Sequence, residues 1–336
     1  RASDLAAALR AAGIDVLIGG FHVSGSLAML PQVPPEIQRL LDAGVSVVAG
    51  EVEGRWEGIL RDALANQLRP VYNFLLQPPA LDAAPLPTLS GRYLRRFVAP
   101  NFGTLDCSRG CPFNCSFCTV INVQGRAMRL RNVERIVGWI RENYRQRGIS
   151  SYFFTDDNFC RNRHWEAILD GLIRLREEEG IRIGFMVQVD TQSYTLPNFI
   201  AKAKAAGCSQ VFIGVESLNA QNLEAAGKRQ NLVANFHAMV EAYRRAGVNT
   251  HVAYIIGFPF DAPASVQQDI RRLTDVLGPE QASFFMLTPL PGSRDHVELC
   301  RRGGSLDPDL NRYDSFHATT DHPLMSRREW TRAYED

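Results

Sequence analysis

Residues 107–118 read Cys107-Ser-Arg-Gly-Cys111-Pro-Phe-Asn-Cys115-Ser-Phe-Cys118, which places four of the seven cysteines of a 336-residue chain within twelve consecutive positions. Closely spaced thiolates on one loop are soft ligands that suit an iron–sulfur cluster or a zinc ion. Structural zinc usually takes two short cysteine pairs separated by a longer loop, but the other three cysteines here are scattered singly. The spacing therefore indicates that Cys111, Cys115 and Cys118 are three ligands of a four-iron cluster with one iron left open.

The pattern Cys-x3-Cys-x2-Cys, with the aromatic Phe117 before its last cysteine, resembles the signature of the radical S-adenosylmethionine (radical SAM) superfamily. The resemblance implies a [4Fe-4S] cluster whose open iron chelates SAM, and a one-electron cleavage of SAM that yields a 5'-deoxyadenosyl radical. Phe117 is then expected beside SAM. A fourth thiolate would block the SAM site, so we expect that Cys107 is not a ligand.

Two other interpretations of this loop stay open. All four cysteines could hold a structural zinc ion, or the loop could carry an iron–sulfur cluster that only transfers electrons. A disulfide framework is disfavoured, because seven cysteines in a chain of this length without an apparent signal segment are typical of a reduced, cytoplasmic protein.

The composition excludes several classes of partner. The net charge of +1 predicts neither a nucleic-acid footprint nor a basic membrane-binding surface. No apolar run is long enough to span a bilayer, so we expect no membrane partner and a soluble protein. The first residue is Arg1, which opens directly into a helical pattern, and we expect the natural chain to begin earlier.

Helices alternate with short apolar strands along most of the chain, which predicts an α/β fold. The first part, residues 1–67, is expected to form an incomplete doubly wound, Rossmann-like sheet with two strands. A proline-rich linker at 68–100 and a tail at 304–336 flank the core. We expect that the tail either folds over the core or forms a surface segment with a short helix near 327–334.

The core at 101–303 is expected to contain six strand–helix units, which predicts a partial (β/α)6 TIM-like barrel. Loops at the carboxyl ends of its strands would carry the chemistry. The expected strands are 102–106, 152–154, 183–189, 211–215, 252–256 and 284–287.

Several strand ends resemble SAM-binding segments of the superfamily. Asp156 and Asp157 follow the second strand, where they would contact SAM or cap the next helix. The resemblance also implies SAM contacts for residues at the ends of the later strands: Gln188, Asp190, Glu216, Ser217, Gly257 and Pro289.

Two glycine turns near the start of the chain, Gly19-Gly20-Phe21-His22 and Gly50-Glu51-Val52-Glu53, resemble the second half of a cobalamin-binding domain. The resemblance implies cobalamin contacts at Gly19, Gly20, Gly50 and Glu51, because a bulky cofactor needs close backbone approach. The cobalt-ligating motif of that domain, Asp-x-His-x-x-Gly, is absent from this sequence. His22 is expected to form hydrogen bonds in its loop rather than to bind cobalt.

These motifs together predict a radical SAM enzyme, with cobalamin-dependent methylation of an unactivated centre as the preferred reaction. The alternative within enzymes is a cobalamin-independent cyclisation or rearrangement. The expected partners are a small-molecule substrate and an external electron donor of the flavodoxin or ferredoxin type.

Overall fold

The computed structural model describes residues 1–82, 84–88 and 90–336. Ala83 and Leu89, which belong to the predicted linker, lie outside the described residues. The chain divides into two compact units, and each unit is assembled from three separate segments. Unit 1 comprises Arg1–Ala84, Phe113–Arg126 and Thr288–Asp321, and unit 2 comprises Pro85–Pro112, Ala127–Leu287 and His322–Asp336.

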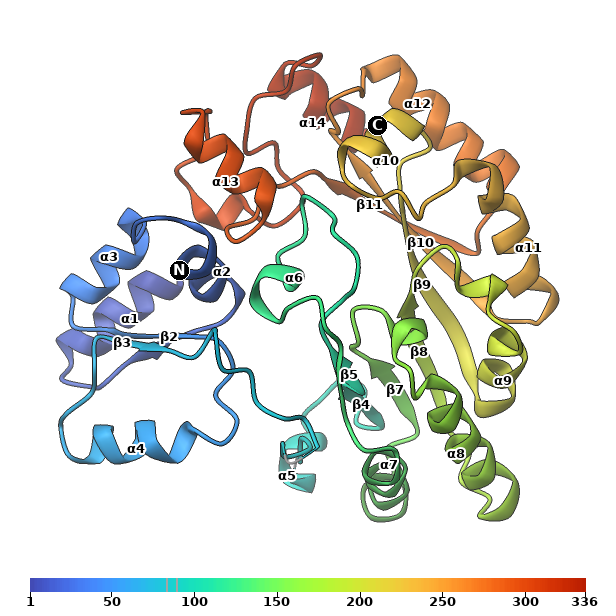
Figure 1. Ribbon diagram of the computed structural model, residues 1–336, viewed down its shortest axis with the longest axis horizontal. Helices are drawn as coiled ribbons and strands as arrows, with labels where there is room; N and C mark the ends of the chain where they lie inside the picture. The colour runs from blue at the N-terminus through green and yellow to red at the C-terminus, as the bar shows by residue number, and fades with distance from the viewer. Residues whose placement is uncertain (83, 89) are drawn as a thin grey trace. The chain divides into compact units, whose positions relative to one another are not determined.

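Unit 2 is built on a parallel sheet in which each strand pairs with the next one along the chain, in the order β11-β10-β9-β8-β7-β4 (Figure 1). Because all strands run the same way, their carboxyl ends meet at one edge of the sheet. All six predicted strands are confirmed, with ends that differ by a few residues. The strands are β4 (Phe102–Leu105), β7 (Ser151–Phe154), β8 (Gly184–Val189), β9 (Cys208–Glu216), β10 (Asn249–Ile256) and β11 (Gln281–Met286).

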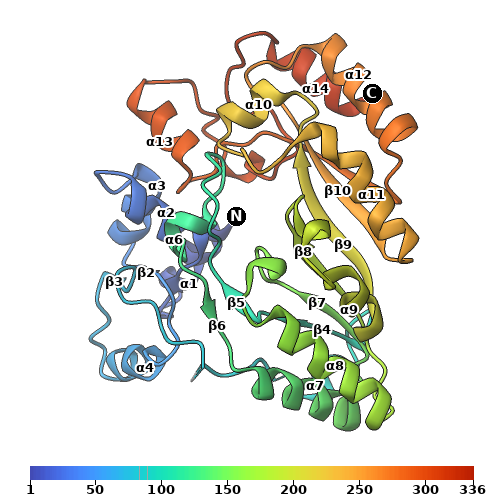
Figure 2. The same cartoon turned by 45° about the vertical axis from the view of Figure 1, so that its right-hand side comes forward.

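Long helices connect these strands and cover one side of the sheet (Figures 1 and 2). Their boundaries follow from capping: in the first of them, Asn132 accepts a hydrogen bond from the Arg135 N–H (3.0 Å), and Gly148 ends the helix in the left-handed conformation. These helices are α7 (Val133–Arg147), α8 (Trp165–Glu178), α9 (Phe199–Ala206), α11 (Phe236–Arg245) and α12 (Pro263–Arg272), and the shorter helices of the unit are α5 (Gly91–Leu94) and α10 (Ala220–Ala225).

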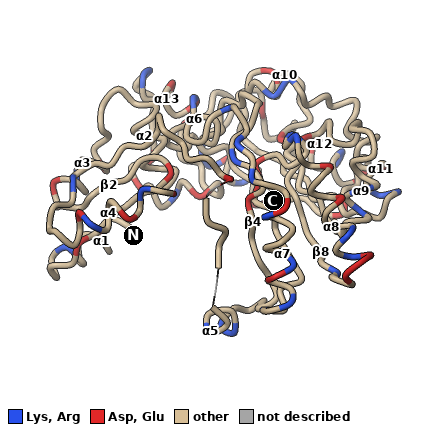
Figure 3. The backbone as a smooth tube through the Cα atoms, turned by 60° about the horizontal axis from the view of Figure 1, so that its bottom comes forward, with Lys and Arg blue, Asp and Glu red and all other residues tan. Residues whose placement is uncertain are grey.

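The core of unit 2 lies between the sheet and these helices. Alternate residues of β8 are buried, and Phe154 of β7 stacks on Phe185 of β8 with ring centroids 4.8 Å apart. The buried face of α8 includes Ile168 and Leu172, whereas its opposite face is charged. Figure 3 shows basic and acidic residues together along α7 and α8, in line with the near-neutral net charge.

Unit 1 contains a three-stranded parallel sheet with strand order β1-β2-β3. Val47 and Ala49, at the centre of the middle strand, are fully buried. Its strands are β1 (Leu17–Ile18), β2 (Ser46–Ala49) and β3 (Val71–Asn73), and its helices are α1 (Ala2–Ala11), α2 (Phe21–Met29), α3 (Pro35–Asp42), α4 (Trp56–Leu64), α6 (Val120–Val123) and α13 (Arg294–Arg301).

Two segments differ from what the sequence predicted. β3 lies in the segment expected to be a linker, and it extends the sheet of unit 1 from two strands to three. The short helix expected near 327–334 is present as α14 (Arg327–Glu335), but its Trp330 is 1% exposed, so this part of the tail is not a surface segment. In the part of the chain that the structure describes, no helix is both long and apolar enough to cross a membrane.

Candidate functional site

The two ends of the cysteine loop are joined in unit 2 by a short ladder and an ion pair. β5 (Ser108–Arg109) pairs antiparallel with β6 (Arg129–Leu130). Asp106, directly after β4, binds Arg131 with 2.9 Å between Oδ1 and Nη2. Arg131 is 3% exposed, so this pair is shielded from water. The ladder and the ion pair therefore hold the two ends of the loop together at the carboxyl end of β4.

Asp156, at the carboxyl end of β7, holds the first residues of that loop. Its Oδ2 accepts the Cys107 N–H (2.8 Å), and its Oδ1 accepts the Ser108 hydroxyl. Gln188 donates to the backbone oxygen of Asp156 (3.1 Å), which joins two predicted SAM-binding positions. Burial raises the pKa of Asp156 to about 7 and that of Asp157 to about 6. Neither the short 3-10 helix that follows (Phe159–Arg161) nor α8 has a side-chain cap, so neither aspartate caps a helix here.

The three candidate ligands lie on a loop that turns sharply. Gly110 takes the left-handed conformation (φ 96°), and the Cys118 N–H donates to the Cys115 carbonyl (3.3 Å). All three thiols are partly buried, so iron and sulfide can reach them. Cys111 belongs to unit 2, whereas Cys115 and Cys118 belong to unit 1 together with Phe117.

Their donor type and accessibility fit an iron–sulfur cluster. Within the described residues, no three His, Cys, Asp or Glu side chains are already drawn together as metal ligands.

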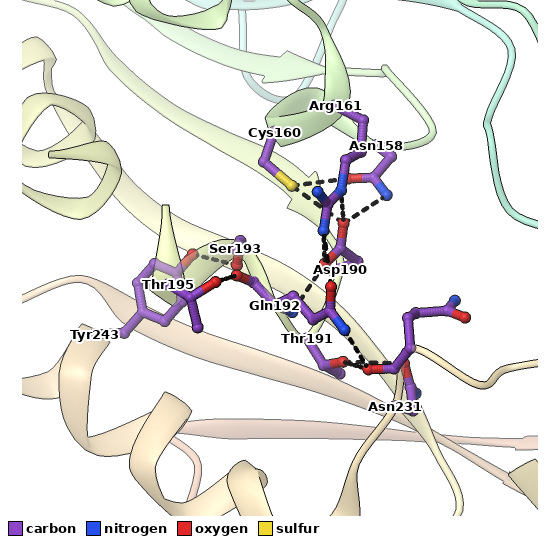
Figure 4. Close-up of polar contacts among 11 residues, drawn as sticks. Asn158, Cys160, Arg161, Asp190, Thr191, Gln192, Ser193, Thr195, Asn231 and Tyr243 are labelled. Atoms are coloured by element: carbon purple, nitrogen blue, oxygen red, sulfur yellow. Dashed lines mark hydrogen bonds and ion pairs between the residues drawn. The ribbon is translucent and has the colours of Figure 1, made fainter. Parts of the chain in front are cut away.

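Asp190, after β8, is the centre of a dense polar network (Figure 4). Arg161 binds it through two nitrogens (2.6 and 2.9 Å), and the Asn158 amide donates to the same carboxylate (3.0 Å). Burial alone would raise the pKa of Asp190, but the hydrogen bonds and charge of Arg161 outweigh it and lower that pKa. A cavity of about 210 Å³ adjoins this network and is lined in part by Gln192 and Gln230. Asp190 is therefore ionised and fixes Arg161 at the carboxyl edge.

Glu216, at the end of β9, forms a buried ion pair with Lys228. The Lys228 ammonium also donates to the Gly214 carbonyl (3.0 Å). Glu216 has a φ of 65°, an uncommon conformation for a residue other than glycine. The adjacent Ser217 hydroxyl accepts the Asn219 N–H (3.1 Å). Glu216, a predicted SAM contact, is thus held in one orientation by a lysine.

Gly257, after β10, is tightly enclosed. Its N–H donates to Asp261 (2.8 Å), its φ is 113°, and a Cβ placed there would lie 2.1 Å from Trp330 Cζ2. The Trp330 indole N–H in turn donates to the Ile256 carbonyl (2.9 Å). Only glycine fits this position. Pro289, another predicted SAM contact, is buried in unit 1.

The two glycine turns of unit 1 follow neighbouring parallel strands and so share one edge of its sheet. The Gly50 N–H donates to the Ser24 hydroxyl (3.0 Å), which connects the second turn to the helix that follows Gly19 and Gly20. Gly20 and Gly50 both have positive φ (98° and 88°), and Glu51 continues the second turn. His22 Nε2 lies 3.3 Å from Glu36 Oε1, so it forms a hydrogen bond as expected, but from helix α2 rather than from a loop.

Sequence reasoning missed four residues that hold these positions: Arg161, Lys228, Asp261 and Trp330. Each lies on a different segment from its partner or several residues beyond it, so no local motif marks it. A charged side chain in a strand-end loop, as at Arg161, was the one available signal.

The family follows from these features and from sequence comparison. The model of the radical SAM superfamily matches residues 105–273, which span the cysteine loop and the strands from β7 to β10. The chain belongs to the radical SAM superfamily, whose members use a [4Fe-4S] cluster and SAM.

The relatives of this chain include methyltransferases. The chain is 30% identical to an uncharacterized methyltransferase of Pyrococcus horikoshii, over 95% of this chain and 69% of that protein. It is 27% identical to bacteriochlorophyllide d C-12(1)-methyltransferase of Chlorobaculum tepidum, over 92% of this chain. The chain spans 64% of the length of the latter protein.

A solved structure shares the fold. The radical SAM methyltransferase TsrM of Kitasatospora setae, solved with a tryptophan substrate and a SAM analogue, superimposes with a TM-score of 0.72 at 17% identity. The superposition covers 99% of this chain and 67% of TsrM.

Proposed function

We propose that the chain carries the catalytic core of a cobalamin-dependent radical SAM methyltransferase that acts on an unactivated centre of a small molecule. The observation that carries this proposal is the three-cysteine loop at the carboxyl end of β4, in a chain whose unit 1 has two glycine turns at one sheet edge. Methyltransferases among the relatives support the reaction type.

In this proposal Cys111, Cys115 and Cys118 hold the [4Fe-4S] cluster. When bound, the cluster supplies the electron for reductive cleavage of SAM. The six-stranded sheet and its helices act as a partial (β/α)6 barrel, which places the functional loops at the carboxyl edge. An external electron donor of the flavodoxin or ferredoxin type would reduce the cluster.

The predicted SAM positions include three buried carboxylates. Asp156, Asp190 and Glu216 are already bound to protein groups, and we assign them the task of orienting the loops around SAM. The remaining predicted positions are proposed as further SAM contacts: Phe117, Asp157, Gln188, Ser217, Gly257 and Pro289.

Unit 1 is proposed to act as the second half of a cobalamin-binding domain. Gly19, Gly20, Gly50 and Glu51 lie on turns at the carboxyl ends of β1 and β2, where open parallel sheets bind ligands. Exposed Gly19 and Gly20 leave their backbone accessible to a large planar cofactor.

One anaerobic assay tests the proposal. The chain is reconstituted with iron and sulfide and given SAM and a strong reductant, and 5'-deoxyadenosine and S-adenosylhomocysteine are quantified. Cys115→Ala should abolish deoxyadenosine formation, whereas Cys300→Ala, a matched change of a cysteine outside the loop, should retain it.

Equal deoxyadenosine from the wild type and Cys115→Ala would reject the radical SAM activity. The methyl-transfer part is tested separately by binding of hydroxocobalamin, followed by gel filtration. Formation of both products only when cobalamin and a substrate are present supports methylation, and deoxyadenosine alone under the same conditions favours the cyclase or rearrangement alternative.

A further inference from the structure

The first residues of α13 hold the segment between Cys111 and Cys118, about 180 positions away in sequence. The Ser116 hydroxyl donates to Asp295 Oδ2 (3.1 Å), and the Asp295 N–H donates to the Ser116 carbonyl (3.2 Å). Arg294 donates from Nη2 to the Asn114 carbonyl (2.9 Å). All of these residues belong to unit 1. Three hydrogen bonds thus fix a stretch of three loop residues.

The start of α13 is itself well anchored. Ser293, which is fully buried, caps the helix by accepting the His296 N–H (3.2 Å). The preceding carbonyl, of Gly292, accepts a hydrogen bond from the Asn122 amide of α6 (2.8 Å). The loop is therefore held at Ser116 and again just after Cys118, at the helix that follows it.

An acidic residue in the first turn of a helix often serves only to complement the helix dipole. Asp295 does more than this, because both its N–H and its carboxylate are directed to the same loop residue. Ser116 is 8% exposed, so its hydroxyl has little access to water as an alternative partner. This geometry specifies one loop conformation rather than a general electrostatic preference.

We propose that Asp295 is a positioning residue for the iron–sulfur cluster, which it influences through Ser116, the neighbour of Cys115. The proposal rests on the assignment of Cys115 and Cys118 as cluster ligands. By restraining Ser116, Asp295 limits opening of the loop that carries these two ligands and so slows loss of iron.

The test compares variants at both ends of this contact. Asp295→Ala removes the acceptor and should speed iron transfer to a chelator about tenfold under anaerobic conditions, with a changed electron paramagnetic resonance line shape of the reduced cluster. Asp295→Asn keeps a carbonyl acceptor of the same shape and should restore most of the wild-type rate. Glu298→Ala, a change of an acid on the same helix that pairs with Arg301 and Arg302, should behave as the wild type.

A double-mutant cycle with Ser116→Ala isolates the contact. If the two side chains act through one hydrogen bond, the double variant should lose iron no faster than either single variant. Fully additive effects would overturn the proposal, as would an Asp295→Ala variant that matches Glu298→Ala in rate and line shape.

Hydrogen exchange of residues 113–118 in the cluster-free chain separates this proposal from the proposed function. Faster exchange in Asp295→Ala and Ser116→Ala than in Glu298→Ala supports the restraint even if no cluster forms. If the wild type binds no cluster, the proposed function alone is rejected. If the wild type binds a cluster but the variants exchange no faster than Glu298→Ala in the cluster-free chain, the restraint by Asp295 alone is rejected.

Discussion

Cys107 and the three cysteines that follow it differ in surroundings. Cys107 is fully buried, and burial raises the pKa of its thiol well above the usual value, with the nearby Asp156 carboxylate adding to the effect. Thiolate is the form that binds iron, so this environment opposes ligation. The other three thiols are partly accessible. The residue environment thus agrees with a three-ligand loop.

Cys107→Ala should therefore leave the cluster in place. We expect unchanged iron–sulfur absorbance after reconstitution and a loss of about 1 kcal/mol in the free energy of unfolding, because a small buried group is removed. An absorbance as low as that of Cys115→Ala would show that Cys107 is a ligand after all.

Asp156 should make stability depend on pH. Its pKa is about 7 in the folded chain against an ordinary 3.8, so the folded state retains the proton to higher pH. Its contribution is fully present below about pH 4 and is lost as the pH rises toward 7.

Asp156→Asn removes this titration while keeping an acceptor for the Cys107 N–H. The free energy of urea unfolding should fall less between pH 5 and pH 8 in this variant than in the wild type, by a few kcal/mol. Asp275→Asn, a change of an exposed acid, is the control and should follow the wild-type pH profile. Identical slopes for Asp156→Asn and the wild type would contradict the expectation.

At the scale of elements, helix α2 contacts the chain segment before α13, and each of the two segments has a glycine at the contact: Gly25 and Gly292. A Cβ at Gly25 would lie 2.7 Å from the Gly292 Cα and 2.8 Å from the Pro291 carbonyl oxygen. Both obstacles are backbone atoms, which cannot rotate away. The absence of a side chain at Gly25 therefore sets the distance between these segments of unit 1.

Gly25→Ala should destabilise unit 1 by about 1–3 kcal/mol even though alanine is the better helix former. Gly58→Ala in α4, where an added Cβ meets nothing within 4 Å, should instead leave stability unchanged or raise it by about 1 kcal/mol. Thermal unfolding of the two variants provides the comparison. A stabilised Gly25→Ala variant would contradict this expectation, because it would show that α2 can move away from Gly292 without loss of stability.

At the scale of the whole molecule, the chain passes repeatedly between its two units. The final segment, His322–Asp336, returns to unit 2, where α14 contacts β10 and β11. Its Trp330 covers Gly257, one of the residues proposed to line the SAM site. The last helix of the chain thus supports a strand end that lies 70 residues or more before it.

Trp330→Ala should cost unit 2 about 3–5 kcal/mol, because it removes a fully buried indole and its hydrogen bond to Ile256. Hydrogen exchange should quicken in β10 and at residues 257–261, while β2 of unit 1 keeps its protection. Trp56→Ala, at a 47% exposed position of unit 1, should have little effect in either unit. Uniform loss of protection across both units would argue that they unfold together.

Local patterns in the sequence were sufficient to predict the cysteine loop and the six strands of unit 2. Each of these depends on residues close together in the chain: the spacing of thiols or the burial period of a strand. The contacts to SAM and cobalamin stay predictions.

Tertiary structure alone decided the third strand of unit 1 and the contacts between distant segments. β3 is too short to stand out among prolines, and it is a strand because β2 is beside it. Arg161 binds Asp190, Asp295 binds Ser116, and Trp330 covers Gly257 across 29, 179 and about 70 residues of chain. Sequence by itself determined which chemistry the cysteine loop can support, since ligand spacing is a local property. Which side chains hold that loop and the strand ends in place depended on folding, because contacts between distant segments leave no periodic or spaced pattern in the chain.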